Sequence, residues 1–413
     1  MGSAFTPVTI GPVTLRNRFI RSGANEMMTY RSRPTQSLLE FHRRLAAGGV
    51  GMTTLAYVAV SPDGRTFASQ GVLNADSIAD YRAITDAVHA EGALASAQIT
   101  HGGSFVQHKE LSTPRAMSSS GGIDKMGVMM GRFFQRQMNR QDMDQVRDEF
   151  VAAARCAVEA GFDAVELHMG HGYLLNQYIS PLSNKRRDEY GGTAEKRARF
   201  PAEVLAAVKQ AVGDRIAVLA KINLYDGAKG GATVEDGIVT AKALEAAGAD
   251  MLVLSGGRNI ESSYVMFSSP LPYDDLALMQ RGFFAKLQFR LLKMATPKTV
   301  KFSELYFLDA ARRVRAAVKC KLGYLGGVLS LDGAEKALAE NFDAVVMARS
   351  LVHDPALVSK WQADVTHRSA CDACNRCVAV MYGPAGTYCT LSGNAIDPKL
   401  NKIYAGEELN HAA

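Results

Sequence analysis

The chain has 413 residues, of which 47% are hydrophobic and 21% charged, so it is long enough to bury a large core. Its 47 basic and 41 acidic residues leave a net charge of +6, too small an excess to indicate nucleic-acid binding. The sequence contains no run of 18 or more apolar residues and no signal-like start, so we expect no transmembrane segment, no secretory signal and a cytoplasmic protein.

Short apolar runs recur along the chain, and three of them share one local pattern. EAGFDAVELH (159–168), AAGADMLVLS (246–255) and AENFDAVVMA (339–348) each contain a helix end, a Gly or Asn turn residue, an aspartate and then a buried strand. Amphipathic helical stretches such as 143–161 and 199–213 separate most of the runs. We expect eight strands, within 18–23, 51–57, 93–100, 159–168, 216–223, 246–255, 321–327 and 339–348.

Eight β/α units without a linker predict the α/β fold class and favour a closed (β/α)8 TIM barrel over an open doubly wound sheet, although periodicity alone does not show closure. Two insertions exceed ordinary loop length: 113–142 after the third strand and 258–306 after the sixth. The second contains a basic, acid-free stretch at 278–301, interpreted as a solvated helical cap, with a substrate lid, an anion or membrane-surface contact and a dimer contact as alternatives. We expect residues 1–360 to form the barrel and residues 361–413 a short cysteine-rich C-terminal extension.

In a barrel of this kind the active site forms where the strands end. The candidate site residues at these strand ends are Ser22, Gly23 and Ala24; Ala56; Gln98 and His101; His168, His171 and Tyr173; Lys221 and Asn223; Ser255, Gly256 and Gly257; Gly326 and Gly327; and Ala348 and Arg349. The Gly pairs and Arg349 follow strands six to eight, where barrel enzymes commonly bind phosphate through backbone N–H groups and a basic side chain. This placement predicts a phosphorylated ligand, although a tight turn explains each Gly pair equally well.

His168, His171 and Tyr173 form the densest group of reactive side chains in the sequence. The two histidines are either structural, half of a metal site, or a pair of donors. No acidic or cysteine partner stands nearby at metal-ligand spacing, which weakens the metal interpretation. Two imidazoles can instead donate hydrogen bonds to one carbonyl oxygen, and Tyr173 would then be placed to supply a proton.

These residues carry a family resemblance. The stretch HMGHGYLLNQYISPLSNKRRDEYGGTAEKRARF (168–200) closely resembles the signature of the Old Yellow Enzyme family of flavin-dependent oxidoreductases. The similarity extends through 5–22, 97–103, 325–328 and 348–355, and so covers nearly the whole barrel. It implies an FMN-bound barrel in which NADH or NADPH reduces the flavin, whose N5 then passes hydride to the β-carbon of an activated alkene.

Site roles follow from the resemblance, residue by residue. It implies that His168 and His171 bind the substrate carbonyl and that Tyr173 protonates the α-carbon. Gln98 matches the residue at the flavin pyrimidine edge, and Lys221 occupies the place of the basic residue near N1 and O2, where many relatives carry Arg. The remaining expected FMN contacts are Ser22, Gly23, Ala24, Ala56, Ser255, Gly326, Gly327, Ala348 and Arg349. Ala24 stands where family members often have Thr, so a hydroxyl near flavin N5 is missing.

Four cysteines gather near the end of the sequence. Cys371, Cys374, Cys377 and Cys389 have the spacing C-x2-C-x2-C-x11-C, which indicates a metal site rather than disulfides in a cytosolic protein. The spacing is similar to the iron–sulfur motif of larger relatives, the dienoyl-CoA reductases and trimethylamine dehydrogenase. A [4Fe–4S] cluster and Zn²⁺ are both compatible with four thiols. Those relatives continue into a second flavin and nucleotide-binding domain, whereas only 24 residues follow Cys389, which weakens the cluster interpretation. Zinc, or cysteines that have lost the cluster, are the alternatives.

The leading hypothesis is an FMN-dependent NAD(P)H oxidoreductase, an ene-reductase that acts on an α,β-unsaturated carbonyl compound, with an enoyl thioester among the candidate substrates. An amine dehydrogenase or demethylase that passes electrons to an external acceptor through an iron–sulfur cluster is the alternative within enzymes, although Tyr173 favours reduction. From other classes, a cofactor-free barrel lyase or isomerase and a non-catalytic flavin electron carrier stay open. A homo-oligomer and a separate electron-transfer partner are compatible with the sequence.

Overall fold

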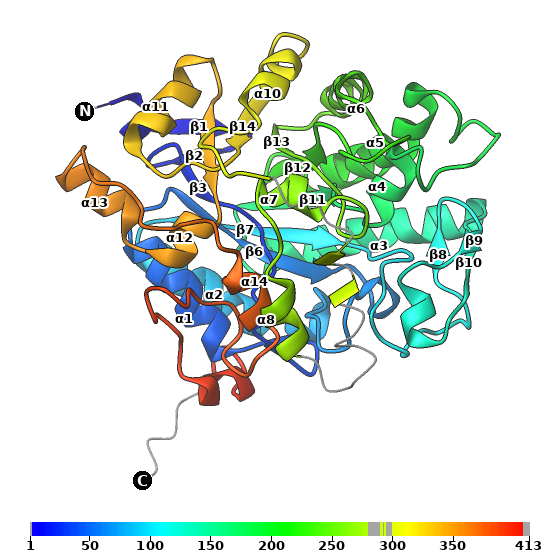
Figure 1. Ribbon diagram of the computed structural model, residues 1–413, viewed down its shortest axis with the longest axis horizontal. Helices are drawn as coiled ribbons and strands as arrows, with labels where there is room; N and C mark the ends of the chain where they lie inside the picture. The colour runs from blue at the N-terminus through cyan, green and yellow to red at the C-terminus, as the bar shows by residue number, and fades with distance from the viewer. Residues whose placement is uncertain (1, 280–289, 292, 295–299, 408–413) are drawn as a thin grey trace.

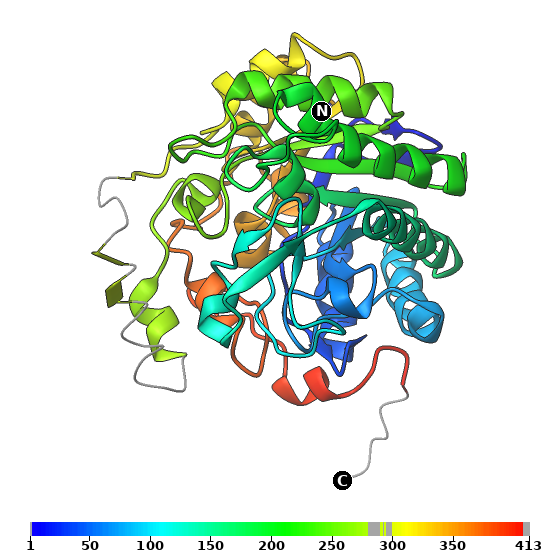
Figure 2. The same cartoon turned by 90° about the vertical axis from the view of Figure 1, so that its right-hand side faces the viewer.

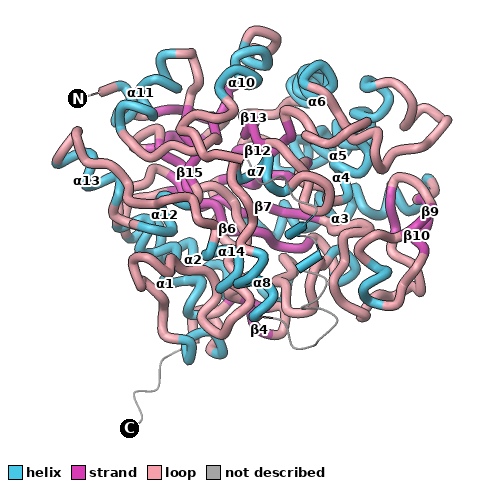
Figure 3. The backbone as a smooth tube through the Cα atoms, in the orientation of Figure 1, coloured by secondary structure: helices cyan, strands magenta, loops and turns pink. Residues whose placement is uncertain are grey.

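A computed structural model describes residues 2–279, 290–291, 293–294 and 300–407. Eight parallel strands close into a barrel in chain order, so the predicted (β/α)8 TIM-barrel fold and its eight strands are confirmed. Figure 3 shows these strands at the centre with helices around them. The barrel strands are β3 (Phe19–Arg21), β6 (Met52–Ala59), β7 (Leu94–Thr100), β11 (Ala164–Met169), β12 (Ala217–Asn223), β13 (Met251–Ser255), β14 (Lys321–Leu325) and β15 (Ala344–Met347).

Amphipathic helices cover the outside of the barrel (Figures 1 and 2). They bury one face against the strands and leave the other polar, which is the usual source of helix stability in such folds. The outer helices are α1 (Gln36–Ala47), α2 (Ile78–Ala90), α3 (Arg140–Glu159), α5 (Ala194–Val212), α6 (Val234–Ala246), α10 (Leu308–Arg315), α11 (Leu331–Ala339), α12 (Arg349–His353) and α13 (Leu357–Ala363). In the part of the chain that the structure describes, no helix is both long and apolar enough to span a bilayer.

Side-chain oxygens define where several of these helices begin. Asn139 and Thr233 form capping boxes with Asp142 and Asp236 at the starts of α3 and α6. The Thr193 hydroxyl accepts a hydrogen bond from a backbone N–H in the first turn of α5. Each cap of this type contributes about 1 kcal/mol to helix stability.

Apolar side chains fill the end of the barrel at which the strands begin. A hairpin of β1 (Val8–Ile10) and β2 (Val13–Leu15) packs its buried residues against this interior. The strand residues in the same cluster include Ile20, Met52, Ala164, Ala217, Leu219, Met251, Val253, Ala344 and Val346. The hairpin therefore closes the bottom of the barrel with apolar contacts and leaves the opposite end for polar groups.

Strand periodicity then determines which polar groups point inward at the open end. Side chains on one face of a strand recur every second residue. Because Ala164 points into the barrel, Glu166 and His168 on the same strand do so as well. Leu219 also points inward, so Lys221, two residues later, shares its face. Val253 and Ser255 share the inward face of β13 for the same reason. The apolar filling thus gives way to a ring of polar side chains near the strand ends.

Both predicted insertions lie at the open end and contact each other. Residues 113–142 form a small sheet of β8 (Met117–Ser118), β10 (Phe134–Gln137) and β9 (Gly122–Ile123). The second insertion contains α7 (Ser263–Phe267) and α8 (Tyr273–Leu278). Lys125 Nζ donates to Glu261 Oε1 at 2.9 Å and so joins the two. Much of the basic stretch 278–301, including Arg281, Lys286 and Lys298, lies outside the described residues, and its interpretation as a cap or lid stays a prediction.

The C-terminal segment returns to the first β/α unit of the barrel. After α13 it forms the short α14 (Arg376–Val380) and then runs past the chain that follows β3. Thr387 N donates to Glu26 O at 2.8 Å, and Thr387 Oγ1 donates to Asn25 O at 2.9 Å. Figure 1 shows this red segment beside the blue α1. The cysteine-bearing segment is therefore packed against the barrel, next to the loop that carries Ser22 to Ala24.

Candidate active site

His168 and His171 contact each other directly at the end of β11. His168 Nε2 lies 2.9 Å from His171 Nδ1, and His171 Nε2 lies 2.8 Å from Ser255 Oγ. The backbone of His171 is left-handed, with φ +62°, and its N–H donates to Asn223 Oδ1 at 3.2 Å. His168 Nδ1 is buried and lacks a hydrogen-bond partner among the described residues. In this arrangement the pair offers one free ring nitrogen to a ligand.

Burial keeps both imidazoles neutral. Burial, together with the smaller effect of the nearby Lys221, lowers the pKa of His171 to about 3. Burial also lowers the pKa of His168 well below its ordinary value, with His171 and Lys221 acting in the same direction. A neutral imidazole carries one N–H, so the tautomer decides whether the free nitrogen donates or accepts.

Three linked hydrogen bonds determine that tautomer. For His168 Nδ1 to carry the proton, His168 Nε2 must accept from His171 Nδ1–H. His171 Nε2 is then bare and must accept from the Ser255 hydroxyl. A donor at His168 Nδ1 therefore requires Ser255 to donate into the pair. The expectation that both histidines donate to one oxygen stays a prediction, and it requires the His168–His171 contact to open.

Tyr173 lies against the histidine pair, as expected for a group that completes the site. Its ring centroid is 4.4 Å from that of His168 and 5.1 Å from that of Tyr57. The Phe105 ring packs edge-on against the Tyr173 ring, with centroids 5.4 Å apart. Burial raises the pKa of Tyr173 well above its ordinary value, and Tyr57 raises it further. The phenol therefore holds its proton at neutral pH and is able to give it up only to a strongly basic centre.

Lys221, Gln98 and Glu166 form a buried polar network in the barrel interior. Lys221 Nζ lies 3.0 Å from Glu166 Oε1 and donates to Gly23 O at 2.9 Å and to Ser22 Oγ at 3.1 Å. Gln98 Nε2 donates to the same carboxylate oxygen at 2.6 Å. Gln98 Oε1 is buried and has no partner among the described residues. An orphaned acceptor beside a cation fits a ligand with a donor N–H and a site of developing negative charge, as a flavin pyrimidine ring has.

A second buried ion pair holds the loop after β3. Arg21 pairs with Glu26, and Arg21 Nη2 donates to Ala24 O at 3.0 Å. Glu26 Oε2 accepts from Ala56 N at 3.0 Å. Ala24 and Ala56, both expected at the flavin site, are thus linked through backbone groups rather than through their own side chains. The methyl group of Ala24 supplies no hydroxyl, as the sequence indicated.

A cavity of about 370 Å³ lies among the predicted phosphate residues, although Gly326 is not part of its lining. Gly327, Ala348 and Arg349 line it, together with Tyr306 and Phe302 from the second insertion. Gly327 has φ +76°, and a Cβ there would approach the Tyr306 ring to 2.8 Å, so only glycine fits this turn. Arg349 Nη1 donates to Asn375 Oδ1 at 2.7 Å and to Ser269 Oγ at 3.1 Å. The guanidinium is therefore anchored, and the cavity is suited to a phosphate group.

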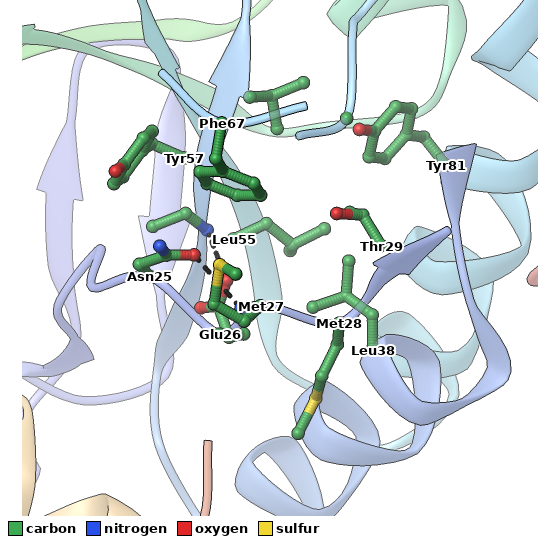
Figure 4. Close-up of a pocket in the computed structure, with 13 residues that line it drawn as sticks. Asn25, Glu26, Met27, Met28, Thr29, Leu38, Leu55, Tyr57, Phe67 and Tyr81 are labelled. Carbon is green, nitrogen blue, oxygen red and sulfur yellow. Dashed lines mark hydrogen bonds between the residues drawn. The ribbon is translucent and has the colours of Figure 1, made fainter. Parts of the chain in front are cut away.

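Another cavity, of about 290 Å³, lies behind Tyr57 and is drawn in Figure 4. Asn25, Glu26 and Met28 line it on one side, and Tyr57, Phe67 and Tyr81 on the other. Its walls include Ala56, so it adjoins the site rather than forming a separate one. Tyr57 lines this space and also contacts Tyr173, with ring centroids 5.1 Å apart.

The four motif cysteines gather beside the phosphate cavity, and all are free thiols. Cys371 lines that cavity, and Cys389 Sγ lies 3.3 Å from His353 Nδ1. Burial raises the pKa of Cys377 to about 12, Arg349 opposes the shift, and the other three cysteines add to it. Within the described residues, no three His, Cys, Asp or Glu side chains stand close enough together to hold a metal ion. The donor chemistry fits a cluster or zinc, but a formed ligand cage is not shown.

Three residues of the site escaped the sequence analysis. Glu166 stands two positions before His168 and shares its inward face, so strand periodicity was the available signal. Tyr57 follows Ala56 directly, and its contact with Tyr173 had no local signal. Arg258 is buried after β13 and donates to Asn176 Oδ1 at 3.0 Å and to Glu261 Oε2 at 3.0 Å, which fixes the loop beside His171. His101, by contrast, was expected and is present, with Nε2 buried and unpartnered in the described residues.

Comparison with known proteins identifies the family of the chain. The model of the NADH:flavin oxidoreductase / NADH oxidase family matches residues 3–275. A 4,4'-dithiodibutanoate disulfide reductase from Rhodococcus erythropolis is 39% identical over 395 residues, covering 94% of this chain and 95% of that protein. The barrel and this kinship define an FMN-dependent oxidoreductase. The chain belongs to the NADH:flavin oxidoreductase / NADH oxidase family, and its resemblance to Old Yellow Enzymes is confirmed.

Solved structures share the fold. A 2-naphthoyl-CoA reductase in complex with 2-naphthoyl-CoA superposes with a TM-score of 0.76 at 22% identity, over 97% of this chain and 57% of that one. An Old Yellow Enzyme homologue from Zymomonas mobilis gives 0.68 at 20% identity, over 90% of this chain and 96% of that one. At these identities the likeness supports the barrel alone.

Proposed function

We propose that this enzyme is an ene-reductase, which reduces the C=C bond of a small α,β-unsaturated carbonyl compound with NADH or NADPH. The observation that carries the proposal is the placement of Tyr173 against the His168–His171 pair, with ring centroids of Tyr173 and His168 4.4 Å apart. A histidine N–H donor beside a phenol suits a polarised alkene, which needs charge stabilised at oxygen and a proton at carbon.

Each group of the site has a distinct task in this reaction. Bound FMN supplies the hydride that it has taken from the nicotinamide cofactor. His168 donates to the substrate carbonyl through Nδ1, and Ser255 and His171 hold the required tautomer. Tyr173 gives its proton to the α-carbon, which becomes strongly basic as hydride arrives at the β-carbon. The Tyr57 and Phe105 rings pack against the Tyr173 ring and so help to keep water from this proton.

Residues deeper in the barrel and beside the cavity would hold FMN. Lys221 places a cation and Gln98 an acceptor where the pyrimidine ring would lie, and the backbone of residues 22–24 approaches the same place. Ala56 and Ser255 complete the walls around the ring. Gly327, Ala348 and Arg349 would bind the phosphate in the cavity that they line, with Gly326 next to Gly327 in the chain.

Disulfide reduction is the second candidate, because the relative that is 39% identical is named for that activity. The same machinery would serve: hydride attacks one sulfur, the S–S bond breaks, and Tyr173 protonates the departing thiolate. The amine dehydrogenase alternative has less support, since oxidation of an amine leaves Tyr173 without a task.

We extend the proposal to the four C-terminal cysteines, the location of the protein and its partners. The four cysteines would hold a [4Fe–4S] cluster or Zn²⁺, which would join the extension 361–413 to the barrel 1–360. A cytoplasmic location, self-association and an external electron-transfer partner are further expectations that accompany the family.

The test uses protein purified without oxygen. An absorption spectrum and mass spectrometry of the released cofactor should identify FMN, and NADPH or NADH should bleach the flavin absorbance. The enzyme should then turn over 2-cyclohexenone to cyclohexanone, with 4,4'-dithiodibutanoate assayed in parallel. Turnover of the disulfide alone would replace the first candidate by the second. Protein that binds no flavin would refute both.

A further inference from the structure

Glu166 is a buried acid whose contacts lie wholly within the proposed flavin site. Its side chain is 2% exposed and projects inward from β11, between the neighbouring strands β7 and β12. One carboxylate oxygen, Oε1, is shared by Lys221 Nζ at 3.0 Å and Gln98 Nε2 at 2.6 Å. Both partners are themselves buried and are the two side chains expected at the pyrimidine ring.

The carboxylate determines which end of the Gln98 amide is available. A carboxylate oxygen only accepts hydrogen bonds, so Gln98 must turn its NH₂ group toward Glu166. Its Oε1 is left buried without a partner among the described residues. Gln98 can therefore accept but not donate toward a ligand on that side. The pyrimidine ring of a flavin carries an N–H between two carbonyl groups, and an acceptor is the complement of that N–H.

Glu166 also balances the charge of Lys221. Burial lowers the pKa of Lys221, and Glu166 is the largest opposing influence. Arg21 lowers this pKa and the more distant Glu26 raises it, while His168 and His171 on the adjoining strand are neutral. No other acid within hydrogen-bond distance of Lys221 Nζ is present in the described part of the chain. Without Glu166, the ammonium group would face two oxygen acceptors but no compensating charge.

We infer that Glu166 is a positioning residue for FMN: its carboxylate orients the Gln98 amide as an acceptor and keeps Lys221 charged beneath the pyrimidine ring. This inference rests on the proposed binding of FMN. Glu166 touches no reacting atom and acts through its two partners.

The first experiment measures FMN binding to the full chain after the flavin has been removed, by quenching of flavin fluorescence. In Glu166→Gln, a neutral amide oxygen replaces the carboxylate oxygen that Gln98 and Lys221 share, so it holds the Gln98 NH₂ group less strongly and no longer compensates the charge of Lys221. We expect the dissociation constant to rise about tenfold or more. Asp250→Asn is the matched control, because it breaks a similar Lys–acid pair, with Lys209 at 2.8 Å, at the opposite end of the barrel. Its FMN affinity should equal that of the native chain.

The second experiment measures how the flavin midpoint potential of the FMN-loaded protein varies with pH. In the native protein Lys221 is charged in both redox states, so only the flavin takes up a proton on reduction. In Glu166→Gln, Lys221 is neutral beside oxidised flavin and takes up a proton when the flavin becomes anionic. The variant should therefore bind one additional proton per two-electron reduction, and Glu166→Gln/Lys221→Met should lose that addition.

The outcomes separate this inference from the proposed function. A native chain that binds no FMN refutes the proposed function. A native chain that binds FMN, with Glu166→Gln equal to it in affinity and in proton uptake, refutes the positioning role alone. Where Glu166→Gln does not fold, Glu166→Leu/Lys221→Met is compared with Glu166→Gln/Lys221→Met, because neither leaves a buried charge unpaired and only the second keeps an acceptor for Gln98 Nε2. The inference then predicts weaker FMN binding in Glu166→Leu/Lys221→Met, and equal binding in the two contradicts it.

Discussion

His168 Nε2 and His171 Nδ1 lie 2.9 Å apart, so the two histidines of the site are bound to each other before any substrate arrives. Because both rings are buried and their pKa values lowered, they share one proton between these two nitrogens. His168 Nδ1 therefore carries an N–H for a carbonyl oxygen only when the Ser255 hydroxyl donates its proton to His171 Nε2.

Ser255→Ala tests this dependence. Without the hydroxyl, nothing holds the proton on His171 Nδ1, and His168 loses its preference for the Nδ1–H tautomer. The KM for an α,β-unsaturated ketone should rise about tenfold, which corresponds to the loss of roughly one hydrogen bond, while reduction of the flavin by NADPH stays unchanged. Thr240→Val, which removes a buried hydroxyl from α6, is the control. Unchanged KM in Ser255→Ala would show that the serine does not set the tautomer.

The neutral histidines predict acid sensitivity of folding. The folded pKa of His171 is lowered by burial to about 3, whereas in the unfolded chain it is near 6.5. Between these values the unfolded state binds the additional proton, so stability falls as pH decreases from about 6.5 toward 3. Urea unfolding at pH 7 and pH 5 should show this loss, and it should be smaller in His171→Asn.

His89 should make the folding stability change with pH in the opposite direction, which the same experiment can measure. Its hydrogen bond to Asp163 raises the pKa of the exposed imidazole, so its contribution is present below the ordinary histidine pKa and is lost as pH rises through the raised value. His89→Asn should therefore increase the loss of stability between pH 7 and pH 5. Equal pH dependence in the native protein and both variants would contradict the assignment of neutral buried histidines.

Arg349 should control the affinity for the FMN phosphate. Arg349→Lys keeps a charge but loses the planar fork that contacts Asn375, Ser269 and the Phe267 carbonyl. We expect about a tenfold weaker FMN affinity, with riboflavin affinity unchanged, measured by fluorescence titration. Arg313→Lys changes an exposed pair with Glu235 on α10 and serves as the control. An equal loss for FMN and riboflavin would show that Arg349 acts on the fold rather than on the phosphate.

The cysteine motif predicts a bound metal. Elemental analysis of anaerobically purified protein should find iron with acid-labile sulfide, or else zinc, near one site per chain. Cys377→Ser should lose it, and Cys156→Ser, outside the motif, should retain it. Native protein that contains neither iron nor zinc would contradict the prediction that the cysteine motif binds a metal. Loss of the metal in Cys377→Ser without loss of FMN would show that the two sites are independent.

Much of the fold could be predicted because burial leaves a local signature. All seven residues of β12 are buried, and its sequence is correspondingly an almost unbroken apolar run. The two-residue strands β8 and β9 had no such signature, because they form by pairing with the distant β10. Short pairings of this kind depend on tertiary context rather than on periodicity.

The site was partly predictable for a similar reason. Residues at strand ends could be placed on one face from barrel geometry alone, and the structure does bring His168, Tyr173 and Lys221 together there. The contact between His168 and His171 was not predictable, since it depends on the left-handed backbone of His171. Arg349 likewise meets Ser269 and Asn375 only through the folding of two separate segments.

Tyr173→Phe tests the central claim most directly, with the two half-reactions followed separately by rapid mixing without oxygen. Reduction of the flavin by NADPH should keep its native rate, while reoxidation by 2-cyclohexenone should slow by roughly 10²–10⁴-fold, the range expected for the loss of a general acid. Tyr178→Phe is the control, because Tyr178 lies five residues after Tyr173 and also has a buried hydroxyl. That hydroxyl donates to Met138 Sδ. Native reoxidation in Tyr173→Phe, with product still formed, would contradict the assignment of Tyr173 as proton donor.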